Sequence, residues 1–431
     1  MSDESAAFPE RPTRVRHAVV SVTALAAVML YLDRVCIAEI AKLDAFRLEL
    51  GLTDSQKGAI LSAFFFSYAL AQVPAGWLSD RWGARRMLPL YIVLWSVCTA
   101  LTGLATGFGM LIAARLIFGI TQAGCYPTAG SLIRRWVPLR GRGTASSLVS
   151  FGGRLGGALA PVLTAWLVQD WLDWRAVLML YGVSGLLVAL LFWSVVRESP
   201  TEHPWCNAAE RAGMAAESSG EESGPPAFPP LLPLMKSPTM WLMGLLQFGI
   251  NFGWAFLVTW LPTYLKDVRQ VDPTIGGWMS TLVLTAGIVG MLAGGPLTDW
   301  AARRFGVRWG RSLPMLGCYA LAFAAYFACL RLESAWAFVA AAALVAFATD
   351  MSVPAIWAYM QDVGGRNTAA AFGWGNMWGN LGAGATTALV PVVLGKWDGN
   401  GDWHEAFWLF SAGYAVAMLC ALGINANRKV V

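Results

Sequence analysis

Apolar residues run in long blocks along almost the whole chain, and short polar turns separate the blocks. A helix needs about 20 apolar residues to cross the hydrocarbon core of a bilayer. The blocks predict an all-α membrane protein with twelve transmembrane helices in two six-helix halves, the fold class expected here. The predicted segments are 17–41, 55–78, 86–106, 108–134, 143–169, 175–197, 238–265, 273–299, 310–331, 334–361, 367–394 and 403–426.

The stretch between the halves has a different composition. Residues 198–237 hold seven prolines, six glutamates and serine-glycine runs. Such a composition buries too little apolar surface to form a core, so the pattern predicts a solvated linker, with a short surface helix near 205–217. The expected domains are a tail (1–16), an N-terminal half (17–197), the linker (198–237), a C-terminal half (238–426) and a tail (427–431).

One short motif occurs once in each half. Gly76–Asp80 and Gly295–Asp299 each close an apolar block, and the second aspartate follows the first by 219 residues. A duplicated apolar chain with one acidic and basic turn per half is typical of membrane transporters. We expect a salt-bridge latch between the halves that favours an outward-open state. Its expected members are Gly76, Asp80, Arg81, Gly83, Arg85, Arg86, Asp299 and Arg304.

Composition supports the membrane assignment. The chain is 57% hydrophobic and 13% charged, whereas soluble domains carry about 25% charged residues. The arginines sit in short turns, which argues against nucleic-acid binding. The seven cysteines are scattered without ligand spacing, so no metal, cofactor or disulfide framework is expected. No nucleophile–base pair or phosphate loop stands out, which argues against an enzyme.

Basic residues alternate between the loops. The N-terminal tail and the loops after 55–78, 108–134 and 273–299 are rich in arginine, and the other loops are not. Because Lys and Arg favour the cytoplasmic side, both termini are expected in the cytoplasm, as an even helix number requires. The expected location is the bacterial inner membrane. The chain is expected to act as a monomer.

Five ionisable residues lie inside predicted spans. A charge at bilayer depth costs several kcal/mol unless it is paired or hydrated, so each one is a functional hypothesis. Their formal sum is +1, which suits an anion. They are Asp33, Arg34, Arg115, Arg154 and Asp350.

Helical spacing groups these charges with polar and aromatic neighbours. Tyr31 shares a face with Arg34, and Gln122 lies two turns after Arg115. The residues predict a central cavity between the halves, with cations and amides for a carboxylate and hydroxyls, and aromatic rings for a carbon skeleton. Further polar stripes within predicted spans are Gln247, Asn251 and Trp254, and Asn376 and Asn380.

Structural interpretations stay open for several of these residues. Asp33 could neutralise Arg34 or Arg115 as an ion pair inside the scaffold. Arg154 could be a packing residue that extends its charge to the surface. The Asn376–Asn380 pair could only join helices.

Four stretches resemble the major facilitator superfamily and, within it, the anion:cation symporter group. They are Tyr31–Arg34, Tyr68–Gly76, Arg115–Gly119 through Pro127, and Trp260–Leu265, beside the repeated loop motif. That group includes galactonate, glucarate and hexuronate carriers and vesicular organic-anion carriers.

The resemblance implies roles for individual residues. Arg34 would bind the substrate carboxylate with help from Tyr31, Tyr68 and amides near Asn376. Asp33 would take up a proton, and Arg115 would belong to the coupling network.

One position departs from the group's pattern. Seven residues after Arg115 the group usually carries an acid that is thought to be a second proton site, and here that residue is Gln122. An amide cannot titrate. We therefore hypothesise that Asp350 replaces the lost carboxylate and that Arg154 holds it ionised or offers a second anion contact. The alternative is a one-proton symporter or a uniporter.

The sequence thus predicts a secondary transporter that imports a small organic anion, such as a sugar acid, with protons. One alternative is another cargo in the same fold, including phosphate or a drug moving outward. The alternative from another class is a membrane sensor that binds an anion without transporting it.

Overall fold

The computed structural model describes residues 11–218, 225–393 and 403–430, and these form helices and turns. The predicted tails, the linker and the last residue of segment 367–394 therefore lie partly outside the described residues. The N-terminal helices are α1 (Val15–Ile40), α2 (Asp44–Glu49), α3 (Asp54–Trp82), α4 (Ala84–Gly103), α5 (Phe108–Gln122), α6 (Cys125–Trp136), α7 (Arg142–Asp170) and α8 (Trp174–Val195).

The remaining helices form the linker and the C-terminal half. They are α9 (Ala208–Ser218), α10 (Leu231–Lys236), α11 (Pro238–Ala255), a π-helical turn (Phe256–Trp260), α12 (Leu261–Asp267), α13 (Pro273–Cys329), α14 (Ala335–Val363), α15 (Thr368–Val393) and α16 (Trp403–Gly423). The surface helix predicted near 205–217 corresponds to α9.

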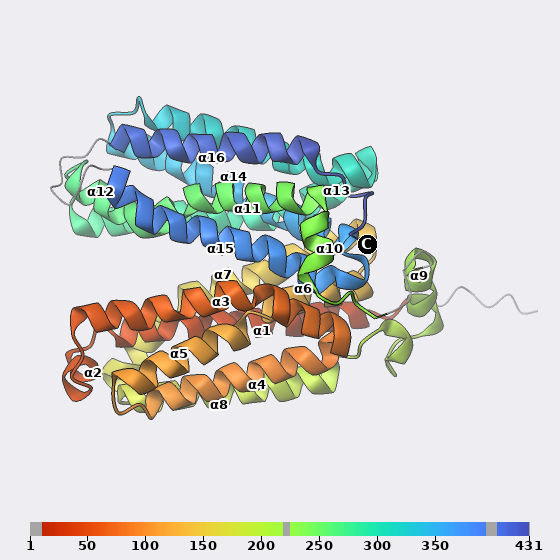
Figure 1. Ribbon diagram of the computed structural model, residues 1–431, viewed down its shortest axis with the longest axis horizontal. Helices are drawn as coiled ribbons and strands as arrows, with labels where there is room; N and C mark the ends of the chain where they lie inside the picture. The colour runs from red at the N-terminus through yellow and green to blue at the C-terminus, as the bar shows by residue number, and fades with distance from the viewer. Residues whose placement is uncertain (1–10, 219–224, 394–402, 431) are drawn as a thin grey trace, which may run out of the picture.

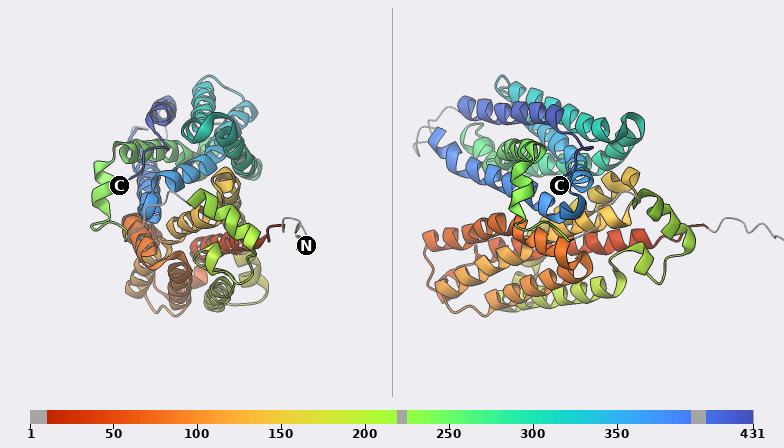
Figure 2. Two further views of the ribbon diagram at one scale, coloured as in Figure 1. Left: turned by 90° about the vertical axis from the view of Figure 1, so that its right-hand side faces the viewer. Right: turned by 45° about the vertical axis from the view of Figure 1, so that its right-hand side comes forward.

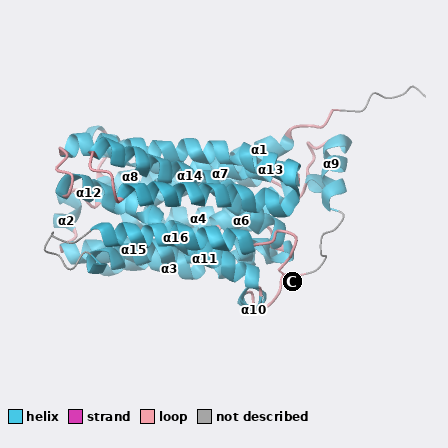
Figure 3. Cartoon of the chain, turned by 90° about the horizontal axis from the view of Figure 1, so that it is seen from above, coloured by secondary structure: helices cyan, strands magenta, loops and turns pink. Residues whose placement is uncertain are grey.

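The long helices run alongside one another in two bundles (Figures 1 and 2). One bundle contains α1 and α3 to α8, and the other contains α11 to α16. They meet where α3 packs on α15, α7 on α13 and α14, and α6 on α15. Helix α9 and the C-terminus lie at one end of the bundle, called here the termini side, and α2 and α12 lie at the other (Figure 3).

Ten helical stretches in the described residues are long and apolar enough to cross a membrane. Helix α15 is not among them, and α13 counts as one of the ten although it spans 57 residues. A straight helix of that length would measure about 86 Å, far more than the roughly 30 Å of a bilayer core.

The sequence predicted two helices, 273–299 and 310–331, within the range of α13, and the backbone breaks between them. Gly306 has φ 74° and ψ 175°, a conformation open to glycine but costly for other residues. A Cβ on Gly310 would collide with the backbone of Ala302, although eight residues of straight helix would separate them by about 12 Å. The chain therefore reverses at Gly306, and α13 consists of two helical arms.

The linker is held against the start of α1. Glu210 on α9 is only 2% exposed. Its carboxylate accepts hydrogen bonds from the Thr13 hydroxyl over 2.6 Å and from the backbone N–H groups of Val15 and Arg16 over 3.3 Å each. The first N–H groups of a helix have no partner inside it, so Glu210 caps α1 and ties the linker to the N-terminal half.

Candidate functional site

Arg34 on α1 is surrounded by aromatic rings. Its guanidinium carbon lies 4.7 Å from the ring centre of Tyr31, 4.5 Å from that of Tyr68 and 4.9 Å from that of Phe64. Its Nε donates to Gln122 Oε1 over 3.1 Å, and one terminal nitrogen is buried without a hydrogen-bond partner among the described residues. Tyr31 and Arg34 share a face, as their spacing predicts. The rings hold the cation in place and leave its charge available to an anion.

Gln122 uses both ends of its amide. Its oxygen accepts from Arg34, and its Nε2 donates to the backbone carbonyl of Leu30 over 2.9 Å. A glutamate at this position would place a carboxylate oxygen against that carbonyl, and two acceptors repel. The amide therefore satisfies both of these partners at once.

Asp33 is fully buried inside the N-terminal half. Trp95 on α4 and Arg115 on α5 lie close enough to interact with its carboxylate, and a Cβ on Gly185 of α8 would lie 3.7 Å from Oδ2. Both carboxylate oxygens, the Trp95 N–H, the Ser96 hydroxyl and the Arg115 Nε have no hydrogen-bond partner at normal geometry in the described residues. This cluster of buried polar atoms lies between helices of one half.

The sequence argument expected Asp33 to face a pocket shared by the halves, and the structure directs it elsewhere. Adjacent residues on a helix point about 100° apart, so Asp33 faces α4 and α8 while Arg34 faces the aromatic ring set. Within the described residues no salt bridge joins Asp33 to Arg34 or Arg115, so the ion-pair alternative is not observed. The Phe64 ring contacts both guanidiniums.

Arg154 and Asp350 meet across the two halves. The Arg154 Nη2 atom lies 2.7 Å from Asp350 Oδ1, and the two side chains are 24% and 6% exposed. The Arg154 guanidinium carbon lies 4.5 Å from the ring centre of Trp254 on α11. Arg154 therefore is not a residue that extends to the surface. It is one of the contacts that join α7 to the C-terminal half, and it is the Asp350 neighbour that the sequence suggested.

The amide stripes have mixed roles. Asn376 Nδ2 donates to Gln72 Oε1 over 3.3 Å and so joins α15 to α3. Asn380 Nδ2 and Asn251 Nδ2 each donate to a backbone carbonyl one turn earlier, over 2.7 and 2.8 Å, to Asn376 and Gln247 respectively. Asn376 thus serves at least as a helix contact, and Gln72, which the sequence argument did not single out, is its partner.

Asp80, in the first copy of the repeated motif, contacts the start of α15. Its two carboxylate oxygens accept from the backbone N–H groups of Ala369 and Ala370, each over 2.9 Å. Gly76, one turn earlier, faces the Ala369 carbonyl so closely that a Cβ there would collide with it. The glycine lets α15 approach, and the aspartate caps it.

Asp299, in the second copy, makes the same contact in the opposite direction. It accepts from the N–H groups of Gly143 and Thr144 at the start of α7, each over 2.9 Å, and from the Thr144 hydroxyl over 2.6 Å. Each half thus caps a helix of the other. A carboxylate at a helix N-terminus satisfies free N–H groups and the helix dipole together.

The sequence predicted that Asp80 and Asp299 join the halves through salt bridges. In the structure these aspartates join the halves through backbone N–H groups. Gly83 has φ 87°, and Glu198 of the same half accepts from the N–H of Arg85 over 3.0 Å. The Arg81 guanidinium lies 5.4 Å from the Trp77 ring centre. The exposed arginines of the motif are Arg81, Arg86 and Arg304.

A second inter-half contact at the termini side was missed from the sequence. Asp362 accepts from Arg142 over 2.7 Å and from Arg311 over 2.8 Å. Arg311 is fully buried and also donates to the Leu139 carbonyl over 3.0 Å. In the sequence, Asp362 shows only as an acid at the end of an apolar block. Arg142 and Arg311 resemble the other arginines of the polar turns, so nothing in the pattern links them to Asp362.

Polar contacts between the halves, among the described residues, gather at the starts of α7 and α15 and at the end of α14. They continue along the same helices as far as the Gln72–Asn376 and Arg154–Asp350 contacts. The halves are therefore closed against each other at the termini side.

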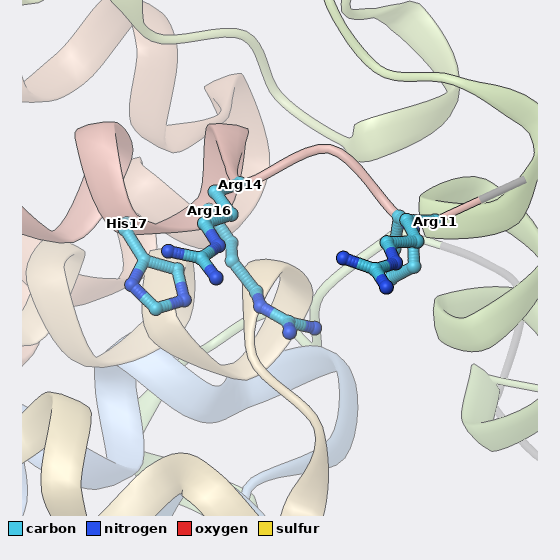
Figure 4. A pocket seen from close by; sticks show the side chains of 5 residues that line it. Arg11, Arg14, Arg16 and His17 are labelled. Carbon is cyan, nitrogen blue, oxygen red and sulfur yellow. The ribbon is translucent and has the colours of Figure 1, made fainter.

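Basic side chains gather where the chain enters α1. Arg11, Arg14, Arg16 and His17 line an open pocket there (Figure 4). The three arginines are the tail residues on which the predicted orientation rests. The pocket lies well outside the candidate site around Arg34 and Arg154.

The family model of the Major Facilitator Superfamily matches residues 23–387. A probable sulfoacetate transporter of Cupriavidus necator is 30% identical over 96% of this chain and 94% of that one. A probable galactarate/D-glucarate transporter of Escherichia coli is 26% identical over 99% of this chain and 97% of that one. The structure of a proton:xylose symporter matches with a TM-score of 0.72 at 15% identity, covering 94% of each chain.

The chain belongs to the Major Facilitator Superfamily, and its relatives there include probable transporters of sulfoacetate and of galactarate/D-glucarate. It is therefore a multi-pass membrane transporter and not an enzyme.

Proposed function

We propose that this transporter moves a small organic anion, a sugar acid such as a hexonate, hexarate or hexuronate, together with protons. The observation that carries the proposal is Arg34, a guanidinium held by three rings and an amide without a carboxylate partner in the described residues. The names of the relatives, which include a galactarate/D-glucarate carrier, support it.

We propose twelve spans in the membrane. The two arms of α13 count separately, and α15 is added to the stretches long and apolar enough to cross. An even number puts both termini on one side, and the basic pocket at the start of α1 favours the cytoplasm of a bacterial inner membrane. The expected unit is a monomer.

The inter-half contacts support an assignment of conformational state. Because they close the termini side, the cytoplasmic path is shut and substrate would enter from the opposite side. Transport would follow when the halves rock about a central cavity that the candidate residues line.

Within that cavity each residue type suits a part of a sugar acid. Arg34 would bind a carboxylate with Tyr31, Tyr68 and Gln122, because bidentate guanidinium–carboxylate pairs are strong and directional. Amides would hold hydroxyls, and an indole would cover the carbon skeleton. The proposed residues for these contacts are Asn251, Asn376, Asn380 and Trp254.

Proton coupling would use two carboxylates. Asp33 is buried beside Arg115, and Asp350 is paired with Arg154. Asp350 would take the place of the acid that Gln122 lacks. A ligand or proton shifts a conformational equilibrium only by its differential affinity for the two states, so proton loss to the cytoplasm must weaken substrate binding.

Proteoliposome uptake of a panel of acidic sugars, with and without an inward proton gradient, tests the function. We expect at least one acid to accumulate, and the gradient to accelerate its uptake and to raise its steady-state accumulation by up to about tenfold per pH unit for each coupled proton. Asp33→Asn should remove the acceleration, while Asp267→Asn, at the exposed last residue of α12, should retain it. A panel with no uptake or counterflow would refute sugar-acid transport and favour export of another cargo or anion sensing.

Asp350→Asn addresses the second carboxylate. We expect uptake to continue but to respond less to the imposed gradient, because one titratable group is gone. The readout is the ratio of initial rates with and without the gradient, measured beside wild type. An unchanged ratio would make Asp350 a purely structural residue.

A further inference from the structure

We propose that Arg154 forms a second anion subsite, which Asp350 occupies in this structure, and that the transported anion therefore carries an acidic group at each end. This rests on the proposed function, since Arg34 must bind the first acidic group. The inference narrows the substrate from sugar acids in general to dianions.

Arg154 has unused binding capacity. A guanidinium carries five N–H donors, and the described structure uses one of them, in the 2.7 Å contact with Asp350 Oδ1. The side chain is 24% exposed, and the Trp254 ring supports it at 4.5 Å. An incoming anion could therefore reach it from the exposed side.

The Arg311–Asp362 pair shows what a purely structural ion pair in this molecule looks like. Its two side chains are 0% and 3% exposed, and Arg311 also donates to the Leu139 carbonyl. Such a pair offers no approach to a solute. Arg154 is more exposed than Arg311 and has fewer partners. We therefore expect a bound anion to replace Asp350 at Arg154, and not to reach Arg311.

The two guanidiniums adjoin one aromatic wall. The Tyr31 ring lies 4.7 Å from the Arg34 guanidinium carbon. The same ring packs against α7 on both sides of Arg154, where Cβ atoms on Gly153 and Gly157 would lie 3.0 and 3.2 Å from it. Tyr31 therefore lies between Arg34 and the segment of α7 that carries Arg154, so the two guanidiniums border the same region.

Charge decides how many acidic groups this arrangement suits. Arg34 has no acidic partner in the described residues, whereas Arg154 and Asp350 together are neutral. A monoanion would neutralise Arg34 and leave the pair intact. A dianion would also displace Asp350 from Arg154, and the displaced Asp350 would take up the co-transported proton, so that no unpaired carboxylate is left buried. Because that pair joins α7 to α14, binding would release one contact between the halves.

The matched pair of probes is glucarate and gluconate, which share a six-carbon polyhydroxy skeleton and differ in one terminal acid. Calorimetry on the purified full-length protein measures binding, and counterflow in proteoliposomes measures transport. Wild type should prefer glucarate. Arg154→Gln should weaken glucarate binding by about 30-fold, the loss of one charged hydrogen-bonded contact, and gluconate binding by less than about threefold.

Asp350→Asn should change glucarate affinity in the direction opposite to Arg154→Gln. Removal of the intramolecular competitor should tighten glucarate binding by about fivefold and leave gluconate unaffected, because a tethered group competes at a high effective concentration. If the Arg154–Asp350 ion pair had only a structural role, Asp350→Asn would not tighten the binding of glucarate alone. Arg308→Gln, at an exposed position, is the arginine control.

Folding can be separated from binding. If Arg154→Gln leaves Asp350 unpaired and the protein unstable, the double variant Arg154→Gln/Asp350→Asn removes both charges, and it should bind gluconate normally and glucarate weakly. Equal weakening of both acids in these variants, or equal wild-type affinity for both, would overturn the second subsite while leaving sugar-acid transport intact. If another acid of the panel binds but neither of these two does, only the second subsite fails; if no acid of the panel binds, the proposed function fails and the second subsite fails with it.

Discussion

Uptake should fall by at least about 100-fold when Arg34 is replaced by glutamine, because a bidentate guanidinium–carboxylate contact is among the strongest polar contacts available. The site holds that guanidinium among three rings with one hydrogen bond, to Gln122. Glutamine removes the charge while the ring set remains. The measurement is initial-rate counterflow together with the dissociation constant of the accepted acid.

A lysine at the same position should recover only part of the loss. Its ammonium keeps the charge but cannot donate to Gln122 and to both carboxylate oxygens in the planar geometry of a guanidinium. Arg331→Gln, at an exposed position outside the site, is the control for general effects of losing an arginine. Folded Arg34→Gln protein with wild-type affinity and rate would refute the assignment of the anion site.

Asp362→Asn should open the termini side of the molecule. Asp362 accepts from Arg142 and from the fully buried Arg311. Its neutralisation leaves the buried Arg311 and the partly buried Arg142 without an acidic partner, and loss of one partner of a buried pair costs about 3–5 kcal/mol. The lost contact joins the halves, so the closed state should lose most of its population.

Chemical labelling of a cysteine placed at the contact between the two halves measures that opening. Ser147 is 3% exposed, and its hydroxyl donates to the Met291 carbonyl of the other half over 2.8 Å. A Ser147→Cys reporter should therefore react slowly with an impermeant maleimide and much faster once Asp362 is changed. The native cysteines in the described residues are all buried, which keeps the background low.

Two substitutions of Asp80, in the first copy of the repeated motif, should increase reporter labelling by different amounts. Asp80→Asn keeps an oxygen that can accept from the start of α15, so the reporter should react only slightly faster, in line with a helix-dipole contribution of about 0.3–1 kcal/mol. Asp80→Lys reverses the charge and should give a larger increase. If reporter labelling stays at the wild-type rate in both Asp362→Asn and Asp80→Lys, these contacts do not hold the halves together.

Much of the candidate site could be foreseen from local rules. Helical spacing put Tyr31 beside Arg34, and bilayer depth singled out Arg154 and Asp350. The same rules did not show where Asp33 points, because helical spacing says which residues share a face and not which helix packs against that face. They also missed Asp362, since an acid at the end of a span looks like any other loop charge until its partners are placed.

The sequence by itself determined the helical class, the duplicated motif and the set of charges that lipid would not tolerate, because apolar block length and helical period are properties of consecutive residues. Only the tertiary structure decided which helix start each repeated aspartate caps, that Gly306 is the residue at which the chain turns between two predicted spans, and that Arg154 meets Asp350 nearly 200 residues away. Those contacts depend on how whole helices are placed and rotated against each other, and no local pattern specifies that placement.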